Sequence, residues 1–180
     1  MKKKLITAII ALTLVLTSVA GITVAWLSVE TKPVENVFTY GDINITLTET
    51  EREYKMIPGT ILPKDPTVTV KANSEACWLF IKVEKVNNPD TYLNYSIDTS
   101  VWTALPGAEG VYYCEVGAVD KDTPYPVLTG NEVVVKEEIT KGQLTAIGTA
   151  YPKLVFTAYA VQKANVASAQ KAWEIANGSN

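Results

Sequence analysis

Two cysteines and two groups of carboxylates are the residues of this chain that could carry chemistry, and the chain has no histidine. Without histidine there can be no Ser-His-Asp or Cys-His site and no H-E-x-x-H zinc motif. Two isolated cysteines cannot form a C-x-x-C zinc site, and no glycine-rich loop of the nucleotide-binding type connects a strand to a helix. The sequence therefore predicts no catalytic, cofactor-binding or metal-binding residue.

The carboxylates lie in two local groups, Glu137-Glu138 and Glu49/Glu51/Glu53. A pair of carboxylates assembled in space could hydrolyse a glycosidic bond. Nothing apolar surrounds either group in the sequence, so nothing there would shift a carboxyl pKa. We interpret both groups as solvated acidic surface, and we expect no enzymatic activity.

Five aromatic residues allow two interpretations. They could form a carbohydrate-binding face, or they could fill the core and its margins. We expect the core, because all of them except Trp102 lie in strongly patterned segments. The residues are Trp78, Trp102, Tyr112, Tyr113 and Trp173.

The two cysteines, Cys77 and Cys114, also allow two interpretations. In an oxidising compartment they could form a disulfide that closes a long loop. Alternatively, both are buried free thiols. Each alternates with apolar neighbours, so each is expected to face the core, but the sequence does not give the distance between them. Both alternatives remain open.

The N-terminus has the parts of a secretory signal peptide. Three lysines at positions 2–4 precede an uncharged run over residues 5–27, which contains the small-x-small triplet Thr23-Val24-Ala25. This pattern predicts a signal peptide over residues 1–25, cleaved after Ala25, so that the mature chain starts at Trp26. The alternative is an uncleaved membrane anchor, because the run is long enough to span a bilayer.

The net charge of the mature chain and its predicted export indicate which partners to expect. Removing residues 1–25 takes away three lysines and no acid, so 16 basic residues become 13 against 19 acidic ones, a net charge of −6. An acidic surface disfavours nucleic acid and anionic membrane as partners. The C-terminus has neither an apolar tail nor a basic end. We therefore expect a secreted protein of the extracellular matrix or cell surface, which contacts the membrane only through an uncleaved signal.

Short alternating segments dominate the mature chain and predict strands. In residues 77–83, Cys77, Leu79, Ile81 and Val83 lie on one side, while Trp78 and Phe80 lie on the other. Residues 101–105 and 111–116 predict a hairpin, and Gly130-Asn131 predicts a second hairpin between residues 125–128 and 132–136. Residues 154–161 are apolar on both faces, which predicts a central strand.

Two segments have helical signals. Thr140 and Gln143 have capping-box spacing, which predicts a short helix from Lys141 to about Ile147. Apolar residues at helical spacing near the C-terminus predict a second helix, with Asn165 as its cap. Together these elements predict a mainly β fold, an antiparallel β-sandwich of the jelly-roll type with one or two short helices, as one domain over residues 41–180 after the signal helix.

The N-terminal region resembles one known family. The apolar run continues through the cleavage site into Trp26-Leu27-Ser28, and an alternating segment follows, in which Phe38, Gly41, Ile43, Ile45 and Leu47 match the family pattern. The chain resembles the TasA/camelysin family of Gram-positive bacteria, whose signals are cut by the SipW-type signal peptidase. Weaker matches continue in Ile57-Pro58-Gly59, in residues 64–70, 77–83 and 110–113, and in residues 151–162.

The resemblance implies a jelly-roll-like sandwich, secretion and a structural role in biofilm matrix fibres. It also implies that residues 26–40 act as a donor strand for the next subunit, with Trp26, Leu27, Val29, Val37 and Phe38 as its apolar residues. Camelysins have been classed as metallopeptidases, but a chain without histidine gives that activity no support. Two hypotheses follow: a head-to-tail homopolymer, or a monomeric surface module that binds carbohydrate or protein. A hydrolase is a third and weaker hypothesis.

Overall fold

A computed structural model describes residues 42–51 and 54–178 of this chain. In this part the protein is mainly β, with antiparallel sheets and two short α-helices. The predicted signal peptide (1–25), its cleavage residues Thr23, Ala25 and Trp26, and the predicted donor strand within residues 26–40 lie outside the described residues.

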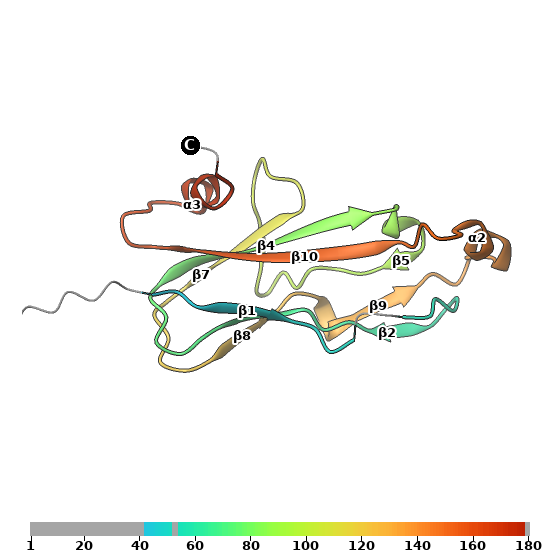
Figure 1. Ribbon diagram of the computed structural model, residues 1–180, viewed down its shortest axis with the longest axis horizontal. Helices are drawn as coiled ribbons and strands as arrows, with labels where there is room; N and C mark the ends of the chain where they lie inside the picture. The colour runs from blue at the N-terminus through green and yellow to red at the C-terminus, as the bar shows by residue number, and fades with distance from the viewer. Residues whose placement is uncertain (1–41, 52–53, 179–180) are drawn as a thin grey trace, which may run out of the picture. The chain divides into compact units, whose positions relative to one another are not determined.

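The strands of residues 42–51 and 54–178 form three antiparallel sheets (Figure 1). The first has the order β10-β4-β7-β6, formed by Lys153–Gln162, Cys77–Val86, Val111–Val116 and Thr103–Ala104. The second has the order β1-β3-β8, formed by Ile45–Thr48, Thr67–Val70 and Thr123–Pro126. The third has the order β2-β9-β5, formed by Ile61–Pro63, Glu132–Val135 and Leu93–Asn94. Short 3₁₀ turns lie at Pro89–Thr91 (η1) and Thr129–Asn131 (η2).

The two smaller sheets continue into each other. β2 and β3 follow one another along the chain, and they pair with β9 and β8, which also follow one another. The hairpin predicted at Gly130-Asn131 is therefore wrong: β8 and β9 do not pair with each other, and η2 carries the chain onward between them. A Gly-Asn pair indicates a local bend, but the partner strand decides whether the chain reverses there.

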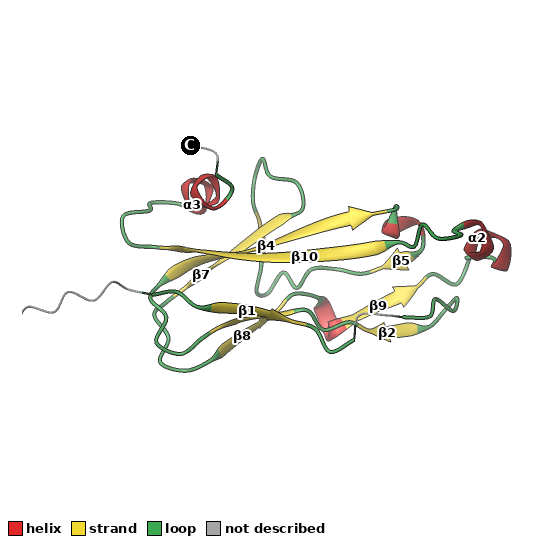
Figure 2. Cartoon of the chain, in the orientation of Figure 1, coloured by secondary structure: helices red, strands yellow, loops and turns green. Residues whose placement is uncertain are grey.

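β4 confirms the predicted two-sided pattern. Its residues Cys77, Leu79, Ile81 and Val83 belong to a core shared with β3, β9 and the segment around Val127. Its residues Trp78 and Phe80 belong to a second cluster on the opposite face. Helix α3, Ala169–Ala176, covers that second face through Ala172 and Trp173 (Figure 2). The first sheet is therefore buried on both sides at this point.

β10 differs from its prediction. It is a ten-residue strand that pairs with β4 along its whole length, but it lies at the edge of the sheet. Both of its faces are apolar because each packs against a different cluster, and not because the strand is central. Phe156 and Ala158 face the shared core, while Tyr159 and Val161 face the cluster under α3. A helix on the outer face has the same effect on the sequence pattern as a central position in the sheet.

Both helices form near the predicted places. Helix α2, Lys141–Ala146, begins with the predicted capping box, because the Thr140 side chain accepts from the Gln143 amide and Gln143 accepts from the Thr140 amide. The predicted cap of α3 is wrong. Ser168 caps this helix by accepting from the Lys171 amide at 3.2 Å, while Asn165 sits in a turn with φ of +63°. An Asn favours both positions, so the residue type alone does not distinguish them.

Candidate binding groove

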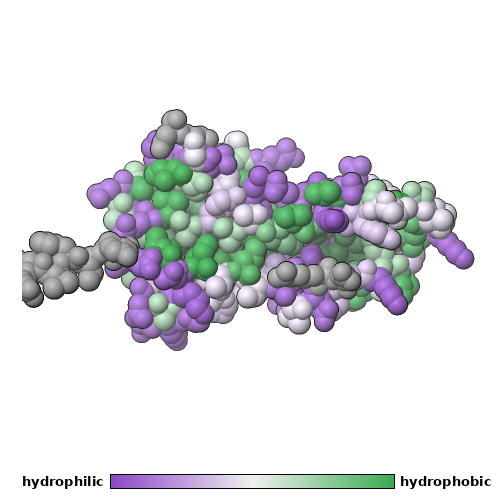
Figure 3. All heavy atoms as spheres, in the orientation of Figure 1, coloured by the Kyte–Doolittle hydropathy of each residue, from purple (hydrophilic) through white to green (hydrophobic). Residues whose placement is uncertain are grey.

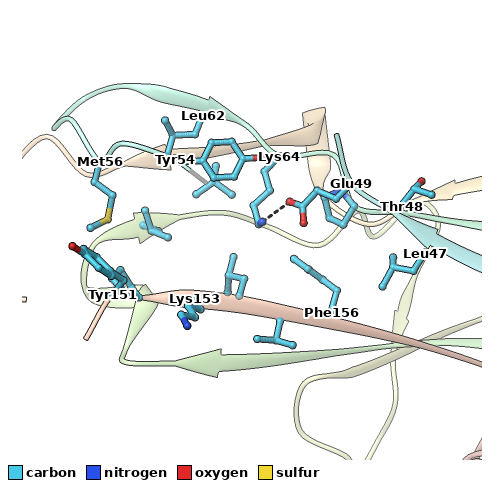
Figure 4. Close-up of a pocket in the computed structure, with 16 residues that line it drawn as sticks. Leu47, Thr48, Glu49, Tyr54, Met56, Leu62, Lys64, Tyr151, Lys153 and Phe156 are labelled. Carbon is cyan, nitrogen blue, oxygen red and sulfur yellow. Dashed lines mark hydrogen bonds and ion pairs between the residues drawn. The ribbon is translucent and has the colours of Figure 1, made fainter. Parts of the chain in front are cut away.

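A groove of about 910 Å³ lies between the edge of β10 and the edges of β1 and β2. Its lining comes from the end of β1, from β2, from the start of β10, and from single residues of β5 and β9 (Figure 4). Glu49, Tyr54 and Met56, which lie between β1 and β2 in the sequence, complete it. On the face drawn in Figure 3, apolar side chains gather along the band between β1 and β10. The groove combines an elongated apolar lining with strand edges on both sides.

The strands beside the groove end at different points. β1 pairs with β3 and stops at Thr48, so it does not extend alongside β2. In the part of the chain that the structure describes, β2 pairs with β9 alone and β10 pairs with β4 alone. Backbone groups on the outer edges of β2 and β10 are thus without a ladder partner within residues 42–51 and 54–178. This is the arrangement in which one more strand can be added, chiefly along β10, because Pro63 has no N–H to donate at the edge of β2.

A lysine and a glutamate form an ion pair inside the groove. The Lys64 ammonium donates to Glu49 Oε1, and the two side chains are 13% and 16% exposed. The Lys64 Nζ also lies 5.4 Å from the ring centroid of Tyr54 and 5.5 Å from that of Phe156, both within cation–π range. The expectation of a solvated carboxylate is therefore wrong for Glu49, because a lysine fifteen residues away reaches it. Glu137 and Glu138 are exposed, as predicted.

Hydrogen bonds hold the segment that follows β1 against the start of β3 at Thr50. The Thr50 amide and hydroxyl both donate to the Asp65 carboxylate, at 2.9 and 2.6 Å. These bonds hold the pKa of Asp65 below its usual value. Burial, followed by the charges of Glu49, Asp65 and Glu51, raises the pKa of Tyr54 to about 12, so its hydroxyl stays protonated at any physiological pH.

The aromatic residues do not form one exposed face. Trp78, Tyr113 and Trp173 pack in the cluster under α3 with Phe80 and Tyr159, at ring-centroid distances of 5.3–6.4 Å. Trp102 is 1% exposed in the shared core, where its indole Nε1 donates to the Pro126 carbonyl at 2.7 Å. Tyr112 packs against the same core. The interpretation as core residues agrees with this arrangement.

Both cysteines face the shared core, as expected, and both are free thiols. Cys77 lies opposite Val116 and Cys114 lies opposite Leu79, so the two cysteines are diagonal neighbours on adjacent strands. Diagonal positions lie ~7–8 Å apart in antiparallel pairs, whereas a disulfide needs Cα atoms within about 6.8 Å. The register therefore favours two reduced thiols over a disulfide.

We expect the two thiols to be unreactive in the folded protein and to weaken the fold at high pH. Burial raises the pKa of Cys77 to about 11, and burial with the charge of Cys77 raises that of Cys114 to about 12. Between the unfolded value of about 9 and these values, only the unfolded chain loses the protons, so stability falls as pH rises through this window. Below pH 9 both thiols are protonated in the folded and the unfolded chain, so they do not lower the stability.

A thiol reagent measures this directly. At pH 8 the two thiols of the native protein should react slowly with the reagent. In denaturant both thiols should react at once. If the denatured protein showed no reactive thiols until a reductant was added, a disulfide would form despite the diagonal register.

The described residues offer neither a metal site nor a membrane-spanning helix. Among the described residues, no group of three or more cysteine or acidic side chains is placed to hold a metal ion. In residues 42–51 and 54–178, no helix has the length and apolar character needed to cross a membrane. The groove is therefore the candidate site that the described part of the chain offers.

Comparison with known proteins finds no matching family model, no similar curated protein and no similar solved structure.

Proposed function

We propose that this chain is a secreted structural subunit of matrix or cell-surface fibres, and that residues 26–40 of one subunit occupy the groove of the next. The observation that carries the proposal is the long edge of β10 beside the groove. The proposal includes export through a signal peptide over residues 1–25, its removal by a SipW-type signal peptidase, and a jelly-roll-like arrangement of the sandwich. Facing antiparallel sheets with a common core support that arrangement.

The sheet edges differ in how well they are protected. β8 is an edge strand with Pro124 and Pro126, which cannot donate to a further strand. β5 and β6 are edge strands of two residues each. β10 has ten residues, no proline and one charged residue, Lys153. A long apolar edge of this kind invites pairing with another chain unless something covers it.

The segment proposed to cover it has suitable chemistry. Residues 26–40 contain five apolar residues of the predicted donor strand, Trp26, Leu27, Val29, Val37 and Phe38. Burying such a side chain contributes ~1.5–3 kcal/mol, although ordering the segment offsets part of this gain. Pro33 interrupts the segment, so we expect pairing on both sides of it but not through it.

The direction of the chain favours a neighbouring subunit as the acceptor. The described chain begins at Asp42, and β1 (Ile45–Thr48) reaches the groove at its last two residues, Leu47 and Thr48. Residues 26–40 would have to reverse direction to reach the groove of their own subunit. Donation to another copy needs no reversal, and a head-to-tail contact that does not close produces a filament.

Electron microscopy and sedimentation of the mature protein, starting at Trp26, test the proposal. We expect unbranched fibres above a critical concentration and monomers below it. Monomers at every concentration would overturn the proposal and favour the second hypothesis, a monomeric surface module in which the groove holds a carbohydrate or peptide.

A further inference from the structure

We propose that Lys64 binds the main chain of the segment that enters the groove, and that Glu49 holds its ammonium group in position for this. The inference rests on the proposed function, because it takes residues 26–40 of a second copy as the occupant. It adds a polar recognition point to a groove whose other contacts are mostly apolar.

The Lys64 ammonium can form more hydrogen bonds than the one it makes with Glu49. An ammonium group has three N–H donors. Among the residues that the structure describes, Glu49 is the one hydrogen-bond partner of this group. The rings of Tyr54 and Phe156 flank the ammonium but use none of its N–H groups in a conventional hydrogen bond. Two donors therefore remain for carbonyl oxygens of an incoming strand.

Lys64 lies where an added strand would pass. It directly follows β2, and its own amide donates to the Asn131 carbonyl at 2.8 Å on the side away from the groove. Its side chain projects into the groove between the β2 and β10 walls (Figure 4). A strand placed beside β2 would thus bring its carbonyl groups past the ammonium.

The Lys64–Glu49 pair is largely buried. A buried ion pair adds little stability, because both charges lose their water when they are covered. The side chains of Lys64 and Glu49 are each less than a fifth exposed. A recognition role accounts for the pair, because an ammonium shielded from water binds a carbonyl more strongly than an exposed one does.

The test replaces the ion pair by apolar residues, Lys64→Met with Glu49→Leu, in the mature chain. Replacing a buried pair by apolar residues of similar volume is often neutral or stabilising, so we expect the urea midpoint to stay close to that of the wild type. The critical concentration for fibre formation should rise at least about tenfold, because hydrogen bonds to a charged group are lost. Lys64→Arg, which keeps the charge and the donors, should assemble nearly as well as the wild type.

A second lysine–glutamate pair provides the matched control. Lys82 and Glu84 lie 3.1 Å apart on the outer face of β4, away from the groove. Lys82→Met with Glu84→Leu should leave the critical concentration unchanged or lower it. If wild-type fibres form and the Lys64/Glu49 double variant assembles at the same concentration, the role of Lys64 is wrong while the proposed function stands. If the wild type forms no fibres, the proposed function fails and this inference fails with it.

Discussion

Deleting residues 26–35 from the mature chain should give a folded monomer that forms no fibres at any concentration. The deletion removes Trp26, Leu27 and Val29, and with them the apolar contacts proposed to hold the next subunit. The deletion removes none of the described residues of the shared core, all of which follow Asp42. Circular dichroism should show an unchanged β signal, and electron microscopy should show no filaments.

A length-matched variant is the control for this deletion. Replacing residues 26–35 by ten glycine and serine residues keeps the chain length but removes the apolar side chains. This variant should also remain monomeric, and a peptide with the sequence of residues 26–40 should bind to it. Fibres from either variant would mean that another part of the chain makes the contact.

Gly110→Ala should destabilise the fold by about 2–4 kcal/mol, the sum of a left-handed backbone conformation and a steric overlap. Gly110 has φ of +70°, and a Cβ added there would lie 2.6 Å from the carbonyl oxygen of Val83. The Val83 amide donates to the Gly110 carbonyl at 2.8 Å, so the two backbones cannot move apart without losing that bond. Chemical denaturation of the monomer measures the loss.

Gly107 supplies the comparison within the same loop. Its φ is +78°, but a Cβ there would have no neighbour within 4 Å. Gly107→Ala should therefore cost only about 1–2 kcal/mol, the conformational part alone. Equal losses of unfolding free energy for the two variants would show that the backbone around Val83 shifts to accept the Cβ without cost.

Local sequence patterns predicted those features that depend on neighbours along the chain. The alternation in β4 gave the two faces of its sheet, and the Thr140 and Gln143 spacing gave the start of α2. The alternation around Cys77 and Cys114 also placed both thiols toward the core. Each of these features is set within a few residues, so a short window of sequence contains the information.

Features that depend on the partner strand could not be predicted in this way. β10 looked central because both faces are apolar, yet its edge is open and α3 covers one face. Trp102 had no patterned surroundings and is nevertheless fully buried. The Lys64–Glu49 pair joins residues that directly follow two different strands, β2 and β1, and no motif marks it. Most of the groove could not be predicted for the same reason, since its walls come from segments far apart in the sequence.

Cross-linking between two singly substituted subunits tests the central claim most directly. One subunit carries Val29→Cys in the proposed donor segment, and the other carries Thr48→Cys in the groove of the acceptor. The two are mixed as monomers, allowed to assemble, and treated with a short bifunctional thiol reagent, with wild-type protein as the background for the two native cysteines. The account predicts a covalent dimer that joins positions 29 and 48, and little product when the second subunit instead carries Glu109→Cys, an exposed loop position away from the groove. Fibres in which position 29 links to 109 as readily as to 48, or to neither, would contradict it.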